Sequence, residues 1–288
     1  MGAPPRKTFA PDYAVPPGET LVEVLESVGL TQAELAERMG RPKKTINEIV
    51  NGKAAITPET ALQFERVLGI EAAFWTSLEH DYRAALARRA ERERLTADVH
   101  WLEELPIAAM IKAGWIEART AAVEQLEAVL AFFGVASVAA WQEVWGNYRQ
   151  GVAFREARTF SSAFGAVAAW LRRSEIEARQ LPTERYDATR FRSALEEIRL
   201  LTATEPETFC PAVVATCAAA GVAVVFIREL PGLRVCGATR WLTPTKAMIA
   251  LTLRYKSNDH LWFTFFHEAA HVLLHGKRAV FLDEDKGQ

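Results

Sequence analysis

Two histidines and a glutamate near the end of the sequence have the residue types and spacing of a zinc site. His267 and His271 are four residues apart, so on a helix both imidazoles face the same side and can bind one zinc ion. Glu268, next to the first histidine, is then placed to polarise a zinc-bound water as a general base. The sequence therefore predicts metal-assisted hydrolysis, with His267 and His271 as zinc ligands and Glu268 as the catalytic residue.

The alternative is an ordinary buried helix whose histidines contact carbonyl groups or water. Four of the six histidines fall in the last 29 residues, which favours a metal site: His260, His267, His271 and His275. A catalytic zinc takes three protein ligands plus a water, and the sequence does not identify the third ligand. His275 lies one turn beyond His271, but a rise of about 6 Å over four residues makes three ligands on one straight helix difficult.

The elements around this motif predict a small sheet that leads into the histidine helix. A helix is expected over residues 206–220, followed by apolar strands over 222–227, 235–241 and 247–255. The histidine helix follows at once, with Ser257-Asn258-Asp259 as its cap. A sheet edge beside such a helix can hold an extended peptide over the metal.

This region resembles the ImmA/IrrE family of metallopeptidases. The resemblance rests on Ala220-Gly221-Val222, Pro231-Gly232, Gly237-Ala238-Thr239-Arg240-Trp241, Ser257-Asn258-Asp259, Trp262-Phe263-Thr264 and the run from His267 to His275. It implies a gluzincin-like zinc site and cleavage of a repressor protein, with His267 and His271 as ligands and Glu268 as general base. The family takes an acidic third ligand from a later helix, farther past the second histidine than this sequence extends. Asp283, Glu284 and Asp285 lie too close for that pattern, so the peptidase domain over residues 205–288 is expected to be incomplete, and its activity stays open.

The N-terminal part of the sequence predicts a helix-turn-helix bundle over residues 20–80. Four helices are expected: 20–28, a second opened by the capping box Thr31-Gln32-Ala33-Glu34, a third starting at Pro42 and ending at Asn51-Gly52, and a fourth over 57–68. Two short helices joined by a tight turn, the second with basic and polar residues at its start, form the DNA-reading arrangement.

Charge is concentrated along one edge of this bundle. Between Arg38 and Lys53 there are five basic residues against one acid, although residues 20–80 together hold six basic and nine acidic residues. The predicted DNA contacts are Lys43, Lys44, Thr45 and Asn47 on the recognition helix, with Arg38 and Lys53 as phosphate contacts. The alternative is a solvated helix edge in a protein-binding bundle.

The same region resembles the Xre/Cro-type helix-turn-helix of HigA-like antitoxins. The resemblance covers about residues 12–85 and rests on Pro17-Gly18-Glu19, the run from Leu30 to Ala36, Ile49-Val50-Asn51-Gly52-Lys53, the run from Ile56 to Ala61, Leu68-Gly69 and Phe74-Trp75. It implies operator binding and autoregulation, and a toxin as a further partner. Because such modules usually bind two half-sites, we expect a homodimer on double-stranded DNA.

The composition is that of a cytoplasmic globular protein with several units. Of the 288 residues 50% are hydrophobic and 24% charged, and we see no apolar stretch of membrane-spanning length and no signal peptide. Three cysteines without a close pair are expected to be reduced thiols. Residues 1–19 are expected to be a flexible tail and residues 81–204 a helical linker or dimerisation region. The predicted fold is therefore mainly α, with a small α+β domain that combines a zincin-like sheet and the histidine helix.

Three functions agree with this organisation. The first is a transcriptional regulator whose zinc metallopeptidase domain cleaves the regulator itself or a companion repressor. The second is a non-catalytic, antitoxin-like autoregulator whose metal-site domain senses a ligand or binds a protein such as a toxin. The third is a peptidase whose helix-turn-helix recruits a repressor protein.

Overall fold

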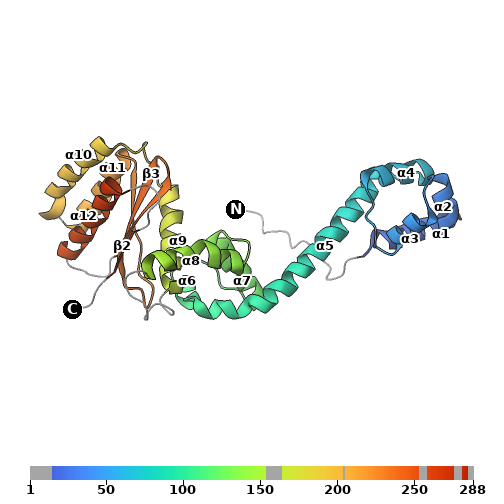
Figure 1. The fold of residues 1–288 in the computed structure, drawn as a ribbon, viewed down its shortest axis with the longest axis horizontal. Helices are drawn as coiled ribbons and strands as arrows, with labels where there is room; N and C mark the ends of the chain where they lie inside the picture. Colours follow the sequence, from blue (N-terminus) through green and yellow to red (C-terminus); the bar gives the residue numbers. More distant parts are fainter. Residues whose placement is uncertain (1–14, 154–163, 204, 253–257, 276–280, 285–288) are drawn as a thin grey trace, which may run out of the picture. The chain divides into compact units, whose positions relative to one another are not determined.

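A computed structural model describes residues 15–153, 164–203, 205–252, 258–275 and 281–284 (Figure 1). By its internal contacts the chain divides into two compact units, Met1–Thr96 and Ala97–Gln288. The first unit is helical, and the second combines helices with a four-stranded sheet. The expected class, mainly α with a small mixed sheet, is confirmed at this level.

The first unit is a helical bundle around one apolar core. Its helices are α1 Pro17–Val28, α2 Gln32–Arg38, α3 Lys43–Val50, α4 Pro58–Leu68 and the long α5 Ala72–Asp98, whose last residues pass the division between the units. The core lies between these helices and contains Leu21, Leu25, Leu35, Ile46, Ile49, Phe64 and Trp75. The 3.6-residue periodicity of the apolar positions places them on the inner faces of the helices.

Three predicted boundaries in this unit differ from the structure. Helix α1 begins at Pro17 rather than at residue 20, and Pro17 and Gly18 are buried, so residues 17–19 belong to the bundle and not to the tail. Pro42 has an extended backbone (ψ 139°) and is the residue that precedes α3, not its first helical residue. Helix α5 also continues across the boundary expected at residue 80. Of the predicted tail, residues 1–14 lie outside the described residues.

The second unit begins with helices packed around aromatic rings. They are η1 Val99–Glu104, α6 Ile107–Lys112, α7 Ala122–Phe133 and α8 Val138–Ala153. The rings of Trp101 and Trp141 meet edge to face with centroids 4.9 Å apart, and Phe133 contacts Trp141 and Trp145 at 5.6 and 5.5 Å. These tryptophans are buried core residues.

No stretch of membrane-spanning length was expected from the sequence, but one stretch has this length. Residues 122–146 are long and apolar enough, by length and composition, to cross a membrane. In the structure this stretch is broken at Gly134, whose φ of 69° ends α7 before α8 begins. Many of its large apolar side chains, among them Leu126, Val129 and Trp141, are buried, although Val144 is exposed.

The rest of the second unit is a mixed sheet with helices on both faces. The elements are α9 Phe164–Gln180, α10 Ala188–Arg199, η2 Leu200–Ala203, α11 Pro206–Ala219, β1 Val222–Phe226, β2 Val235–Thr243, β3 Lys246–Leu251, α12 Asn258–Leu274 and β4 Phe281–Glu284. The strand order is β1-β3-β2-β4; β1 and β3 are parallel, while β2 is antiparallel to β3 and to β4.

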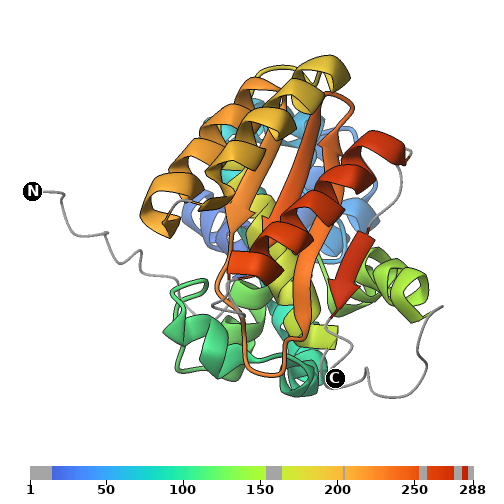
Figure 2. The same ribbon diagram turned by 90° about the vertical axis from the view of Figure 1, so that its left-hand side faces the viewer.

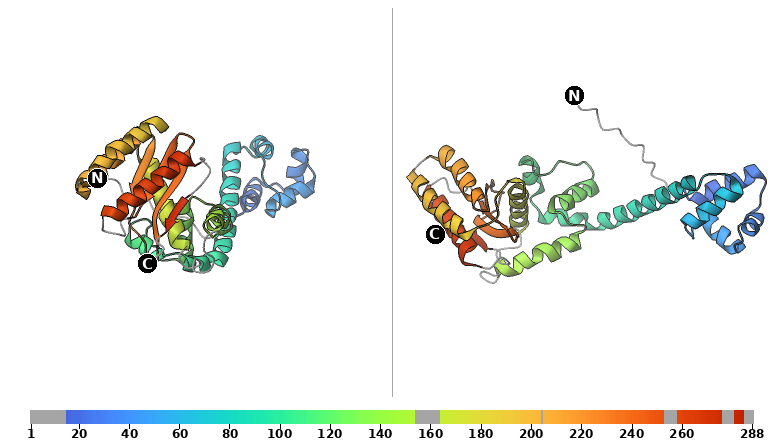
Figure 3. Two further views of the ribbon diagram at one scale, coloured as in Figure 1. Left: turned by 60° about the vertical axis from the view of Figure 1, so that its left-hand side comes forward. Right: turned by 90° about the horizontal axis from the view of Figure 1, so that it is seen from above.

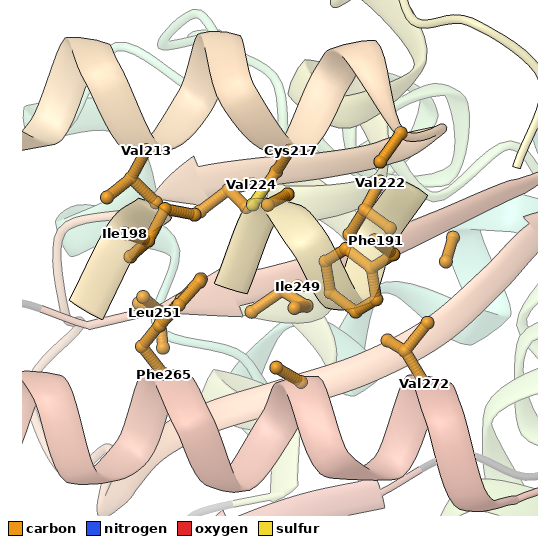
Figure 4. Close-up of a cluster of buried hydrophobic side chains, with 14 of the residues drawn as sticks. Phe191, Ile198, Val213, Cys217, Val222, Val224, Ile249, Leu251, Phe265 and Val272 are labelled. Atoms are coloured by element: carbon orange, nitrogen blue, oxygen red, sulfur yellow. The ribbon is translucent and has the colours of Figure 1, made fainter. Parts of the chain in front are cut away.

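Two neighbouring residues of β2 show which helix covers which face. Thr239 donates a hydrogen bond to the backbone oxygen of Glu268 on α12 (3.0 Å), whereas Arg240 forms an ion pair with Glu175 on α9. Since successive strand residues point to opposite faces, α12 and α9 lie on opposite sides of the sheet (Figure 2). Helices α10 and α11 share the α12 side, and their apolar residues meet those of β1, β3 and α12 in one core (Figure 4).

Helices α9 and α10 therefore pack with the sheet, although they precede the domain boundary expected between residues 204 and 205. Trp170 of α9 donates through its indole nitrogen to the backbone oxygen of Ile227 (3.3 Å), directly after β1. Strand β4 was not predicted. The ends of two predicted elements, residues 253–255 of the third strand and Ser257 of the helix cap, lie outside the described residues.

Candidate nucleic-acid interface and candidate metal centre

Helices α2 and α3 are positioned by local caps and by the common core. The Thr31 hydroxyl accepts a hydrogen bond from the backbone of Glu34, and the Glu34 carboxylate accepts one from the backbone of Thr31 (2.8 Å), so the predicted capping box is present. The hydrogen bonds that the Glu34 carboxylate accepts from the backbone and from the hydroxyl of Thr31 hold the pKa of Glu34 below its ordinary value. One side of α3, with Ile46 and Ile49, is buried in the core of the bundle. The side with Lys43, Lys44 and Asn47 is exposed.

Two contacts that the sequence analysis did not identify fix α3 in the bundle. A Cβ atom on Gly18 would lie 2.1 Å from the backbone oxygen of Val50, so only glycine allows α1 to approach the end of α3 this closely. Glu79 of α5 is buried and accepts a hydrogen bond from the backbone of Ile56 (3.1 Å) while pairing with Arg83 (2.6 Å). The sequence does contain a signal for the first contact, because Gly18 is a glycine at the start of a helix. The contact of Glu79 with Ile56 joins residues 23 positions apart and has no such signal in the sequence.

The predicted DNA-contacting residues lie on or beside the exposed side of α3. Lys43, Lys44 and Asn47 are exposed and Thr45 is half-buried, while Arg38 at the end of α2 and Lys53 after α3 are exposed. The residues therefore follow one another along the α2–turn–α3 segment and the loop after it. Their contact with DNA stays a prediction.

The charge of this edge is reduced by one acid. Lys44 and Glu48 are four residues apart on α3, with Lys44 Nζ 3.7 Å from the Glu48 carboxylate; the lysine side chain is 84% exposed and that of the glutamate 39%. An ion pair this exposed is weak, so phosphate groups can compete for the lysine. Arg41 is used differently: its Nε donates to Gln63 Oε1 (2.6 Å), which ties the turn between α2 and α3 to α4.

The two histidines of the candidate metal centre face one another on α12. Nε2 of His267 and Nε2 of His271 are 3.0 Å apart, and the two rings are nearly perpendicular at 86°. Two nitrogens bound to one tetrahedral zinc lie about 3.3 Å apart, given Zn–N bonds of about 2.0–2.1 Å. The separation therefore suits a shared metal ion, and His267 is exposed at the helix surface.

Glu268 lies on the sheet side of α12 and is completely buried (0% exposed). A Cβ atom on Gly237 of β2 would lie 2.9 Å from Cγ and 3.1 Å from Oε1 of Glu268, so the glutamate side chain occupies the space that a larger strand residue would need. The Thr239 hydroxyl, two residues along β2, donates to the Glu268 backbone oxygen (3.0 Å). Strand β2 therefore sets the position of the glutamate next to the histidine pair.

A second aromatic contact holds His271. The Phe281 ring of β4 stacks on the His271 ring, with centroids 3.9 Å apart and planes 9° from parallel, and it also contacts His275 at 4.6 Å. Helix α12 and β4 lie side by side (Figure 3, left) because β4 pairs with β2, with Phe281 opposite Thr239. This role of Phe281 was not predicted, although the apolar run over residues 279–282 is a signal for a strand.

These residues provide two candidate zinc ligands and do not identify a third. Among the described residues, no group of three or more His, Cys, Asp and Glu side chains is placed to hold a metal ion. The ring of His275 lies 5.1 Å from that of His271 and packs against the ring of Phe281. Asp283 and Glu284 are in β4, and Asp285 lies outside the described residues.

Comparison with known proteins points to the first unit. A helix-turn-helix family model matches residues 21–75. The chain is 30% identical over 89 residues to an uncharacterized HTH-type transcriptional regulator of Escherichia coli, YddM, covering 31% of this chain and 88% of that protein. It is 38% identical over 64 residues to the antitoxin HigA-1 of Vibrio cholerae, covering 22% of this chain and 60% of the antitoxin.

A solved structure gives a similar match. It is the Pseudomonas aeruginosa antitoxin HigA with the higBA promoter, at 29% identity and a TM-score of 0.28, covering 28% of this chain and 90% of that chain.

Proposed function

Because the chain belongs to the helix-turn-helix family of transcriptional regulators, we propose that it binds an operator as a homodimer and carries a zinc metallopeptidase domain. The exposed side of α3, with Lys43, Lys44 and Asn47 beside one another, supports the DNA contact. Each protomer would place α3 in the major groove of one half-site, and Arg38 and Lys53 would contact phosphates. Such a regulator would act in the cytoplasm.

The DNA contact is tested by footprinting on the promoter region of the chain's own gene. We expect protection of an inverted repeat, lost in the double variant Lys43→Ala/Lys44→Ala because both cations of the recognition helix are removed. Glu48→Gln is the matched opposite change: it removes the acid that pairs with Lys44 and should strengthen binding at low salt. Binding that depends steeply on salt but protects no defined site would mean charge attraction alone.

The peptidase proposal rests on the 3.0 Å separation of the His267 and His271 nitrogens beside the buried Glu268. These histidines would hold zinc, which when bound supplies Lewis acidity toward a water and a scissile carbonyl. The Glu268 carboxylate would accept the proton of the attacking water and deliver it to the leaving amine nitrogen. The substrate would be the chain itself or a companion repressor, so that cleavage relieves repression.

Glu268→Gln separates metal binding from proton transfer. The variant should retain the zinc content of the parent protein, measured by elemental analysis after gel filtration in metal-free buffer, because glutamine has nearly the same shape. Cleavage of the chain or of a co-purified repressor should be lost, because the amide cannot accept the proton. Turnover that survives in Glu268→Gln would exclude this mechanism, while His267→Ala serves as the variant that loses zinc as well.

One observation favours a second function, that of a non-catalytic autoregulator resembling an antitoxin. The described residues supply only two imidazoles for a metal, and one of the relatives is the antitoxin HigA-1. In this case the sheet domain would bind a small ligand or a protein such as a toxin. Operator binding without any zinc-dependent cleavage, together with a stable complex with a toxin encoded beside it, would support this function over the peptidase.

A further inference from the structure

Two asparagines one turn apart on α3 and its C-terminal end share hydrogen bonds. Nδ2 of Asn51 donates to the backbone oxygen of Asn47 (2.7 Å) and to the side-chain oxygen Oδ1 of Asn47 (3.2 Å). Asn51 is the capping residue directly after α3, with φ −86° and ψ 8°, and both asparagines are exposed. The Asn51 amide therefore directs its donor group at Asn47.

These two bonds fix which way the Asn47 amide faces. A backbone oxygen can only accept, so the atom of Asn51 that contacts it must be the NH2 group. Because that NH2 group can only donate, the atom of Asn47 that it meets must be the oxygen. One lone pair of Asn47 Oδ1 thus accepts from Asn51, which turns this oxygen toward Asn51 and places the NH2 group on the other branch of the amide. No described residue accepts a hydrogen bond from that NH2 group.

An asparagine held in this way offers DNA a donor. An asparagine whose two amide atoms are both available pairs with adenine, accepting from N6 and donating to N7. In the major groove guanine presents two adjacent acceptors, N7 and O6, whereas adenine places a donor beside its acceptor. The geometry points to guanine as the base read by Asn47, with Asn51 as the positioning residue that selects guanine over adenine. This inference rests on the proposed operator contact of α3.

Lys43 agrees with this assignment. It lies four residues before Asn47, so the two side chains share one side of α3, and both are exposed. Lysine also prefers the O6 and N7 acceptors of guanine. Lys43 therefore presents donors only, and the orientation of the Asn47 amide adds a donor on the same side of the helix.

The test is selection of binding sites from a random pool of duplex DNA by the full chain and its variants. Asn47→Ala identifies the base pair that Asn47 reads, because the preference at that position disappears. We expect guanine at that position for the parent protein. In Asn51→Ala the ratio of guanine to adenine should fall about tenfold, because the Asn47 amide is no longer held and can turn Oδ1 toward N6 of adenine. Lys53→Ala is the control; it should weaken binding at all sites without changing the base preference.

A second measurement does not depend on the folding of the Asn51 variant. Replacement of the selected guanine by 7-deazaguanine removes the N7 acceptor. It should weaken binding of the parent protein and leave the weaker binding of Asn47→Ala unchanged.

The outcomes separate the inference from the function on which it rests. If the parent protein enriches no sequence, the proposed operator binding itself is wrong. If it enriches a site but the Asn47-dependent base is not guanine, or no position depends on Asn47, the inference is overturned and DNA binding stands. A guanine preference that survives in a folded Asn51→Ala variant overturns the positioning role of Asn51.

Discussion

At the scale of single residues, the glycine at position 237 of β2 makes room for a residue of the candidate metal centre. Gly237 has no Cβ, and the methylene and carboxylate of Glu268 occupy the vacated space beside the strand. The neighbouring Thr239 hydroxyl holds the same helix residue through its backbone oxygen. The glutamate and the histidine next to it are thus placed by the strand as much as by their own helix.

Gly237→Ala should therefore disturb α12. The added methyl group would lie 2.6 Å from Cγ2 of Thr264 and 2.9 Å from Cγ of Glu268, both on a packed helix that has to shift. We expect a loss of about 1–3 kcal/mol of stability, as for other overpacked cores, and a lower zinc content. Thermal denaturation and elemental analysis measure the two effects.

Gly146→Ala is the control for this change. A Cβ atom at Gly146, in α8, has no neighbour within 4 Å, so the variant should be neutral or slightly more stable. Equal behaviour of the two alanine variants would show that Gly237 is not needed for the packing of α12.

At the scale of elements, short helices depend on their ends. Helix α2 has only seven residues, too few to be stable alone, and its first turn is closed by the reciprocal bonds of Thr31 and Glu34. Since α2 packs against α3 across the turn, the capping box also supports the presentation of the recognition helix. Thr31→Ala should cost about 1 kcal/mol of stability.

The contribution of Glu34 should depend on pH. Hydrogen bonds from the backbone and the hydroxyl of Thr31 lower the pKa of this carboxylate in the folded state. A lowered pKa stabilises the fold at pH above the unfolded value, and that contribution is lost as the pH falls through the folded value. The stability difference between the parent protein and Glu34→Gln should therefore shrink as the pH is lowered from about 6 to about 3. Urea denaturation across this range measures it, and a difference that stays constant would contradict the role of the carboxylate.

At the scale of the whole molecule, the two units have separate apolar cores. The first core contains Phe64 and Trp75, whose rings are 5.1 Å apart, and Trp75 is the only tryptophan among residues 1–96. The core around the sheet is built from other residues, among them Phe191, Val224, Ile249 and Phe265 (Figure 4). Each unit can therefore lose its structure by loss of its own core.

Phe64→Ala tests this independence. Removal of a completely buried ring should cost the first unit about 3–5 kcal/mol. In calorimetry of the full chain we expect one of two transitions to move to lower temperature and the other to stay. Trp75→Phe identifies the transition of the first unit, since it removes the fluorescence of that unit. A single transition that moves as a whole would show that the units unfold together.

The sequence alone determined the helix-turn-helix unit and the local elements around the histidines. These rest on short-range signals: the capping box at Thr31, the glycine that ends α4 at Gly69, and the four-residue spacing of His267 and His271. Caps and helical periodicity act over a few residues, so they can be read directly from the order of residue types. The same argument placed β1, whose apolar run is continuous, and the strands β2 and β3, whose residues are mostly apolar.

Only the tertiary structure decided which distant residues support these elements. The stacking of Phe281 on His271, the space that Gly237 leaves for Glu268 and the buried contact of Glu79 with Ile56 join residues 10, 31 and 23 positions apart. The amide direction of Asn47 likewise depends on the actual positions of the Asn51 atoms. Such contacts follow from how whole elements pack, and packing depends on the summed shape of many side chains, which no local pattern of residue types encodes.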